Sequence, residues 1–141
     1  MLSQTAQYAL RAVVFLANQE RSPVTRTVIA EGTMVPADYL LKVLKGLELA
    51  HIVESRRGPG GGYILAIPAD ELSVYEVVVS VDEIPRITTC PLGIKNHKRL
   101  CPLHQLLDDA SRTIEESFKK TMIADLVVRG KHGCDFPALE S

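Results

Sequence analysis

The sequence is poor in aromatic residues and in cysteine. Among its 141 residues there is no tryptophan, aromatic side chains make up 5%, and three residues are cysteine. We therefore expect an aliphatic core, and the cysteines are too few for a disulfide-rich scaffold. The longest early apolar run, residues 12–17, is far too short to cross a bilayer. No basic segment precedes a long apolar stretch at the start of the chain, so we expect no secretory signal, no membrane partner and a cytoplasmic location.

A strong charge of one sign is also lacking, since the net charge is −1. This value hides an asymmetry. Residues 1–66 hold seven Lys/Arg and five Asp/Glu, a net +2, whereas residues 67–141 hold nine and twelve, a net −3. A mildly basic first half and an acidic second half suggest two roles on one chain. The length suits one small domain with an appended dimerisation element.

The first half of the sequence has the element order of a winged helix-turn-helix. Apolar spacing predicts a helix over 3–18, a short helix over 25–31 that Gly32 ends, and a third helix over 36–48. Between residues 51 and 66, two short strands, HIVES and YILA, flank the glycine-rich turn RRGPGGG. Three helices followed by a β-hairpin predict a DNA-binding head.

The second half is predicted to be a loop followed by a long helix. Ser73 and Glu76 have the spacing of a capping box, which predicts a helix over about 74–82. Proline, glycine and cysteine recur in residues 84–102, which predicts an irregular loop. An apolar stripe then predicts a helix over 103–120, and a short helix is predicted over 122–128. We therefore predict a mainly α fold with a small β-hairpin wing and a long C-terminal dimerisation helix. Its parts are a winged helix-turn-helix domain at 1–83, a cofactor-binding loop at 84–102, a dimerisation region at 103–128 and a flexible tail at 129–141.

The predicted head contains candidate DNA contacts on three elements. The first turns of a recognition helix meet base edges and its lysines reach phosphates; the candidates there are Asp38, Tyr39, Lys42 and Lys45. The hairpin adds Arg56, Arg57 and Gly60, and the start of the second helix adds Thr25 and Arg26. Alternatively, Tyr39 is half-buried against the first helix, and the charged residues are ordinary solvated surface.

A second cluster of candidates lies in the loop before the long helix. Cys90, His97, Cys101 and His104 fall within fifteen residues, in the pattern Cys-x6-His-x3-Cys-x2-His. Thiolates and imidazoles are ligands of iron–sulfur clusters and of zinc. The alternative is a loop with two cysteines and two incidental histidines. Outside this cluster, Cys134 is a distal ligand, a redox thiol or a plain tail cysteine.

Several segments together resemble one family. They are QTAQYALRAVVFLA, PADYLLKVLKGLELAHIVES, RGPGGGYILA, ELSVYEVVVSVDE and the CPLH that precedes the long helix. Over residues 1–128 the chain resembles the Rrf-type winged-helix transcription regulators, the IscR- and NsrR-like iron–sulfur regulators. This resemblance implies a dimeric, cytoplasmic, bacterial regulator of transcription whose cluster sets its affinity for double-stranded DNA. It also implies that Arg57 is the wing arginine used on DNA.

The resemblance carries a ligand set over to the loop, with departures. Cys90 matches the first cysteine of the family pattern, Cys101 the last, and His104 a downstream histidine that some members use. The middle cysteine is absent, and His97 lies near its place. Two cysteines with two histidines resemble the mixed ligation of Rieske-type centres. We therefore expect a [2Fe–2S] cluster rather than [4Fe–4S], with zinc or no metal as the alternatives.

The sequence predicts a regulator and not an enzyme, because no carboxylate set for acid–base catalysis accompanies the cluster. We expect a homodimer whose DNA affinity is switched by a redox- or nitric-oxide-sensitive [2Fe–2S] cluster. The alternative is a metal-free or zinc-bound regulator that acts through a protein partner.

Overall fold

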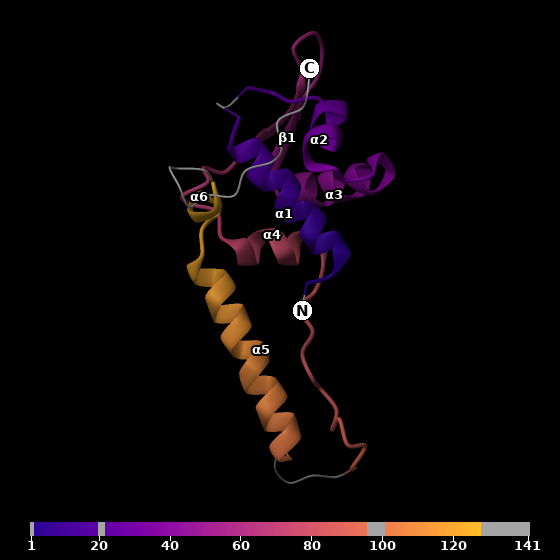
Figure 1. The fold of residues 1–141 in the computed structure, drawn as a ribbon, viewed down its shortest axis with the longest axis vertical. Helices are drawn as coiled ribbons and strands as arrows, with labels where there is room; N and C mark the ends of the chain where they lie inside the picture. The colour runs from indigo at the N-terminus through magenta and orange to yellow at the C-terminus, as the bar shows by residue number, and fades with distance from the viewer. Residues whose placement is uncertain (1, 20–21, 96–100, 128–141) are drawn as a thin grey trace.

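The computed structural model describes residues 2–19, 22–95 and 101–127, which are mainly helical with a two-stranded antiparallel hairpin (Figure 1). In chain order the elements are α1 (Gln4–Ala17), α2 (Arg26–Thr33), α3 (Ala37–Leu49), β1 (Val53–Arg56), β2 (Gly62–Leu65), α4 (Val74–Val81), α5 (Pro102–Lys120) and α6 (Ile123–Leu126). The elements from α1 to α4, together with α6, form the head, and α5 extends away from it (Figure 1). The predicted fold class is confirmed.

The core of the head is aliphatic, as the scarcity of aromatic residues predicts. The largest fully buried side chains belong to Ile29, Leu40, Leu44, Leu47, Leu72 and Ile123. Helix α1 lies at the centre and contacts α2, α3, α4 and α6. Its buried alanines at 6, 9 and 12 allow these neighbours to approach closely. Full burial of each leucine or isoleucine contributes about 1.5–3 kcal/mol, so this core fixes the orientation of α3.

Helix α2 is longer than the sequence predicts. It runs through Gly32 to Thr33, and the left-handed residue that follows it is Met34, at φ 58°. Gly32 is buried against α1, where a Cβ atom on it would lie 2.3 Å from Cε2 of Phe15. The glycine therefore leaves room for the Phe15 ring where α1 and α2 cross, and the prediction that it ends the helix is wrong.

The hairpin is short and is attached to the start of α2. Strand β1 pairs with β2 in antiparallel register, with Arg56 opposite Gly62. The first strand begins at residue 53 rather than 51, because His51 has a left-handed backbone with φ 59°. In addition to its pairing with β1, Tyr63 exchanges two backbone hydrogen bonds with Val24, at 2.9 and 2.8 Å. These bonds hold the wing against the helix-turn-helix.

The chain leaves the head after α4 and returns to it beside the start of α4 (Figure 1). Ser73 and Glu76 form the predicted capping box at the start of α4, with the Ser73 nitrogen 2.8 Å from Glu76 Oε2. On the return, the backbone N–H of Ile123 donates to the carbonyl oxygen of Leu72 at 2.7 Å. The end of the excursion formed by the loop and α5 is therefore fixed to the head beside the capped start of α4.

Helix α5 begins one residue earlier than predicted, with Cys101 as its N-cap. Along this helix only His104 is buried, and the apolar stripe lies largely open, with Leu106 62% exposed. Helix α6 covers only part of the predicted 122–128. Within the described residues, no helix combines the length and the apolar character that crossing a membrane requires.

Candidate nucleic-acid interface and cysteine site

Helix α3 buries one face and exposes the other. Its buried side chains, Leu40, Val43, Leu44 and Leu47, recur at helical spacing and point into the core. The exposed side chains are those of Asp38, Tyr39, Leu41, Lys42 and Lys45. All four predicted contacts of this helix are therefore accessible from solvent.

Tyr39 contacts α1 while it remains half exposed. Its ring stands edge-on to that of Tyr8, with the centroids 5.6 Å apart, and 49% of the residue is exposed. Tyr8 is itself held by Gln4, whose Nε2 donates to the phenol oxygen at 2.8 Å, and by Arg11, whose Cζ lies 5.4 Å from the ring centroid. An edge-to-face pair adds about 0.5–1.5 kcal/mol beyond its burial. The two interpretations of Tyr39 from the sequence are therefore compatible, because the ring contacts α1 and is also accessible.

Glycines shape both the tip of the wing and its contact with α2. At the tip, Gly60 has φ 72° and no atom lies within 4 Å of the position a Cβ would take. Gly62 is different, because its φ is 144° and a Cβ there would lie 2.5 Å from both the carbonyl carbon and the carbonyl oxygen of Val24. Gly60 therefore gives an open tip, and Gly62 allows the wing and the helix-turn-helix to touch.

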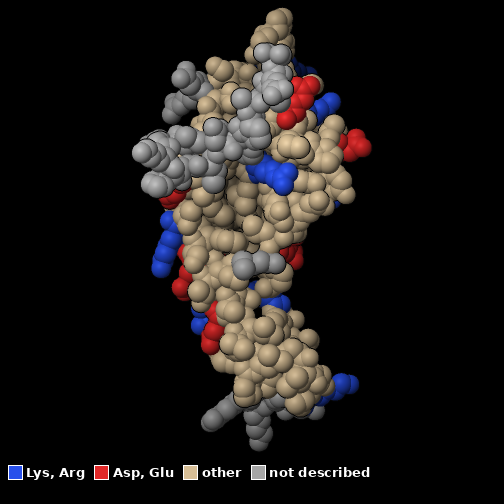
Figure 2. Space-filling view, in the orientation of Figure 1, with Lys and Arg blue, Asp and Glu red and all other residues tan. Residues whose placement is uncertain are grey.

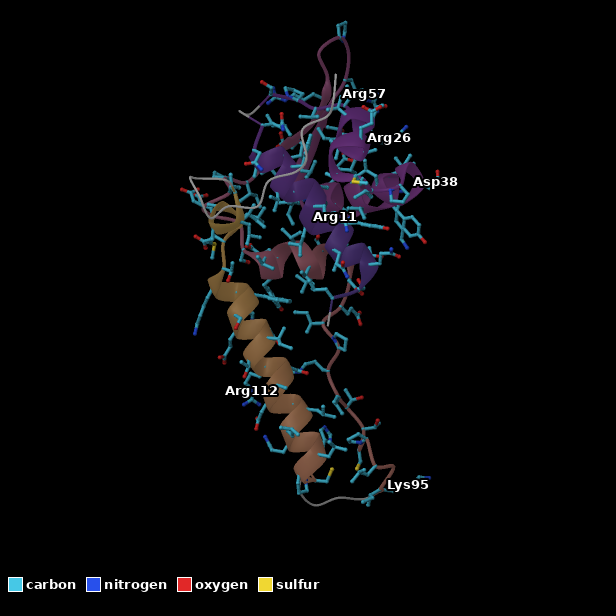
Figure 3. All side chains as sticks on the ribbon, viewed as in Figure 1. Arg11, Arg26, Asp38, Arg57, Lys95 and Arg112 are labelled. Carbon is cyan, nitrogen blue, oxygen red and sulfur yellow. The ribbon has the colours of Figure 1, made fainter. Side chains whose placement is uncertain are left out.

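The cations of the wing and of α2 lie along one edge of the head in Figure 3. Arg56 is the last residue of β1, Arg57 follows it, and both are exposed. Figure 3 shows Arg57 at the base of the wing turn, Arg26 on α2 and Asp38 at the start of α3. Backbone hydrogen bonds join the wing to Val24, just before the N-cap of α2, so the wing and α2 are direct neighbours.

Thr25 is the N-cap of α2. Its Oγ1 accepts the backbone N–H of Val28 at 3.4 Å, and the next residue, Arg26, is exposed. A capping hydroxyl still has its own hydrogen to donate. The side chain can therefore cap the helix and donate to a phosphate oxygen at the same time.

The loop brings two of the predicted metal ligands together. The Sγ atom of Cys90 lies 3.6 Å from that of Cys101, well beyond the roughly 2.05 Å of a disulfide bond. Cys101 is buried, and its sulfur accepts the backbone N–H of His104 at 3.3 Å. Cys90 is partly exposed on a turn in which the N–H of Gly93 donates to its carbonyl oxygen at 2.9 Å. The turn that carries Cys90 therefore lies next to the start of α5, and the sulfur atoms of Cys90 and Cys101 face each other.

The hydrogen-bond partner of His104 determines its tautomer. This side chain is buried, and its Nε2 lies 2.8 Å from the carbonyl oxygen of Ile87. A carbonyl oxygen only accepts hydrogen bonds, so Nε2 carries the hydrogen and the lone pair of the neutral ring lies on Nδ1. The side chain therefore ties α5 to the loop and leaves Nδ1 as the ring nitrogen with a free lone pair.

Two of the sequence candidates cannot be placed. His97 and Cys134 lie outside the residues that the structure describes. In the part of the chain that is described, no three histidine, cysteine or acidic side chains converge as a group able to hold a metal ion. The structure therefore brings the two sulfurs together, with His104 close by in sequence and bonded to the loop.

Arg86 is a loop residue that the sequence reasoning missed. Its guanidinium lies 3.5 Å from Asp108 Oδ1 and 3.2 Å from Glu115 Oε2, so it holds the loop along α5. Glu115 also accepts a hydrogen bond from Lys119, and this bond, followed by the charges of Lys119 and Arg86, keeps the pKa of Glu115 below its ordinary value. Asp108 and Glu115 are seven residues apart and so share one helix face. Two acidic residues at this spacing could have indicated that a basic side chain pairs with this face of the helix.

A family model described as "Rrf2: Iron-dependent Transcriptional regulator" matches residues 2–129. The chain belongs to the Rrf2 family. A Haemophilus influenzae relative with the provisional name of an HTH-type transcriptional regulator is 35% identical over 129 residues, covering 89% of this chain and 85% of the relative. IscR of Sodalis glossinidius is 33% identical over 129 residues, covering 89% and 78%. The solved structure of T. potens IscR has the same fold, with a TM-score of 0.75, 24% identity, and coverage of 89% of this chain and 84% of that one.

Membership of the Rrf2 family fixes the function at a coarse level. Its members are regulators of transcription, and the named relatives are HTH-type regulators from bacteria. The chain is therefore a bacterial, DNA-binding transcription regulator of the Rrf2/IscR type and not an enzyme. The predicted family is confirmed.

Proposed function

We propose that this Rrf2-family regulator is a homodimer that binds double-stranded DNA and holds a redox- or nitric-oxide-responsive [2Fe–2S] cluster at Cys90, Cys101 and a histidine. The observation that supports the cofactor is the 3.6 Å between the two sulfurs. Two thiolates on one tetrahedral metal ion, each about 2.3 Å from it, lie about 3.8 Å apart. The sulfur pair therefore fits two ligand positions on one iron or zinc ion with little movement.

Histidine supplies the remaining ligands in this proposal. His104 would bind through Nδ1, because its Nε2 is bonded to the carbonyl of Ile87. Metal-binding imidazoles commonly make such a bond with their second nitrogen, which orients the ring. His97 is the other candidate, four residues before Cys101. When bound, a [2Fe–2S] cluster supplies a centre whose charge changes with its redox state, at a potential that histidine ligands raise.

The chain's own contacts make the loop and the start of α5 respond together. Arg86 is ion-paired to Asp108 and Glu115, and His104 is hydrogen-bonded to Ile87. Both contacts join the loop to α5 between the sulfur pair and the head. A change of charge or ligation at the two sulfur atoms would therefore shift α5 as well as the loop.

On the head, we assign phosphate contacts to exposed cations and base contacts to the start of α3. The phosphate contacts are those of Thr25, Arg26, Lys42, Lys45, Arg56 and Arg57. Asp38 and Tyr39 lie in the first turn of α3, where a recognition helix meets base edges. We assign Arg57 to a minor groove, where the negative potential favours arginine, and the bare backbone of Gly60 to the close approach of the wing tip to the duplex.

Helix α5 is the proposed dimer interface. Leu106 is 62% exposed, and Ala110 on the next turn is exposed as well. Figure 2 shows charged side chains along one edge of α5 and mostly uncharged surface toward the loop tip. A second α5 lying on this surface would bury the apolar side chains, each worth about 1.5–3 kcal/mol when fully covered. Two heads would then meet half-sites about 34 Å apart along the DNA.

Anaerobically purified protein tests the cofactor. We expect coloured protein with iron and sulfide in equal amounts and without zinc. Zinc without iron would support a zinc-bound regulator, and the absence of both would support a metal-free regulator that acts through a protein partner. Loss of colour in only one of His97→Ala and His104→Ala would identify the histidine ligand.

The switch is tested by DNA affinity at one fixed salt concentration. We expect the holo, oxidised or nitrosylated, and apo forms to differ in affinity for the same duplex. Arg57→Gln is the matched control, because it should weaken binding in every state without changing the ratio between states. Equal affinities in all states would refute the switch and leave the assignment as a DNA-binding protein intact.

A further inference from the structure

The cysteine pair is arranged for a reaction that needs no metal. The two Sγ atoms are 3.6 Å apart, so they need to approach by only about 1.5 Å to reach bonding distance. Cys101 is fixed, because it is the buried N-cap of α5 and its sulfur accepts the N–H of His104. Cys90 lies on a turn whose Gly93 has φ 74° and open space around it. The movement therefore falls on the turn and leaves the helix in place.

We propose that Cys90 and Cys101 of the metal-free chain form an intramolecular disulfide when they meet a hydroperoxide. The site would then sense peroxide directly, in addition to any cluster it holds. This inference shares the two sulfurs with the proposed cofactor site, but it does not require that a cluster binds.

The difference in burial sets the order of the two steps. Cys90 is partly exposed whereas Cys101 is 8% exposed, so the Cys90 sulfur meets the oxidant first. It attacks the peroxide, the O–O bond breaks, and a Cys90 sulfenic acid and an alcohol (or water, from hydrogen peroxide) form. The Cys101 sulfur then attacks the sulfenic sulfur. The S–O bond breaks, the S–S bond forms, and the hydroxyl leaves with the Cys101 proton as water, so two thiols are oxidised and one peroxide is reduced.

The position of the pair gives the disulfide two consequences. Both sulfur donors are consumed, so the oxidised chain cannot use them for a metal ion until a reductant restores the thiols. The bond also joins the turn covalently to the first residue before α5, beside the existing bond between His104 and Ile87. Oxidation therefore strengthens the same link between loop and helix that the non-covalent contacts make.

The test uses full-length Cys134→Ser protein, stripped of metal and fully reduced, so that this pair holds the remaining thiols. The protein is treated with hydrogen peroxide, alkylated and digested with trypsin without reductant. Lys95 and Arg99 lie between the two cysteines, so trypsin separates peptide 87–95 from peptide 100–112. We expect most of the protein to yield these two peptides as one linked species, two hydrogens lighter than their sum, which a reductant splits.

Two matched variants and a dilution series complete the test. Neither Cys90→Ser nor Cys101→Ser, each made in the Cys134→Ser background, should give the linked peptide. Dilution of the protein should leave the extent of linkage unchanged, because the reaction is intramolecular. A sulfenic acid that persists on Cys90 and reacts with dimedone, or linkage found only between chains, would overturn the inference. Colourless, iron-free protein that still forms the link would refute the cluster alone, and iron-loaded protein whose stripped form makes no link would refute the disulfide alone.

Discussion

The contact between the wing and α2 can be tested at one backbone position. In Gly62→Ala the new Cβ would lie 2.5 Å from the carbonyl carbon and oxygen of Val24 and 2.9 Å from the amide nitrogen of Thr25. These are backbone atoms, so no side-chain rotation relieves the overlap, and the wing must move away from α2. That movement disrupts the two backbone hydrogen bonds between Val24 and Tyr63.

The expected loss of stability follows from these contacts. Two backbone hydrogen bonds are worth about 1–3 kcal/mol together, and an alanine at φ 144° adds about 1–3 kcal/mol of strain. We therefore expect Gly62→Ala to lower the free energy of unfolding by about 2–6 kcal/mol. Gly60→Ala is the matched control, since Gly60 has φ 72° but nothing within 4 Å of its would-be Cβ. It should show backbone strain alone, about 1–2 kcal/mol.

Urea unfolding of the apo protein, followed by far-ultraviolet circular dichroism, gives both free energies. DNA affinity is then measured at a temperature at which both variants are folded. We expect Gly62→Ala to bind more weakly than Gly60→Ala, because the first displaces the whole wing and the second alters only its tip. Equal unfolding free energies in the two variants would refute the proposed contact. A destabilised Gly62→Ala with unchanged affinity would show that the wing does not contribute to DNA binding.

Other predictions test the remaining surfaces. In a dimer, Arg57→Gln should reduce the slope of log affinity against log salt by about 2, since each protomer loses one phosphate contact, whereas Lys120→Gln on α5 should leave titrations over a salt series unchanged. Leu106→Glu should give folded monomers in sedimentation analysis, because this side chain is 62% exposed within one chain and the fold of that chain does not depend on it. Ser73→Ala should cost about 1 kcal/mol of unfolding free energy, measured by urea titration, through loss of the capping hydroxyl. The pKa of Glu115 is lowered from 4.5 in the folded chain. Its ionised form therefore stabilises the fold above pH 4.5, and this contribution is lost as the pH falls through the folded pKa. In acid unfolding curves, Glu115→Gln should lack this pH-dependent contribution.

Periodicity predicted the long helices well because each has an apolar stripe at helical spacing. The bounds of α1, α3 and α5 lie within one or two residues of the prediction. Gly32 was misread because its role depends on Phe15, a residue of another helix, and no local pattern records that contact. The start of β1 was missed for a similar reason, since a left-handed backbone at a histidine has no clear sequence signal.

The candidate site was predictable in its residue types but only partly in its geometry. The spacing of cysteine and histidine in the loop was sufficient to mark the site, and the structure brings the two sulfurs together. The bond from His104 to Ile87 could not be predicted, because its acceptor is a backbone carbonyl in an irregular segment. The ion pairs of Arg86 were easier to predict, because Asp108 and Glu115 share one face of α5.

In the proposed switch, the place of the sulfur pair would determine how a signal from it reaches DNA. The pair lies at the end of α5 that is farthest from the head (Figure 1). Nineteen helical residues span about 28 Å, so a tilt of about 5° at that end displaces the other by about 2 Å. Helix α4 contacts α5 and also α3, where Val81 Cγ1 lies 3.1 Å from the position of a Cβ on Gly46. Helix α3 is therefore in close contact with an element that also packs against α5. In the proposed dimer, a tilt of α5 would shift the whole head relative to its partner and would also press on α3, and both effects would act on the fit to two DNA half-sites.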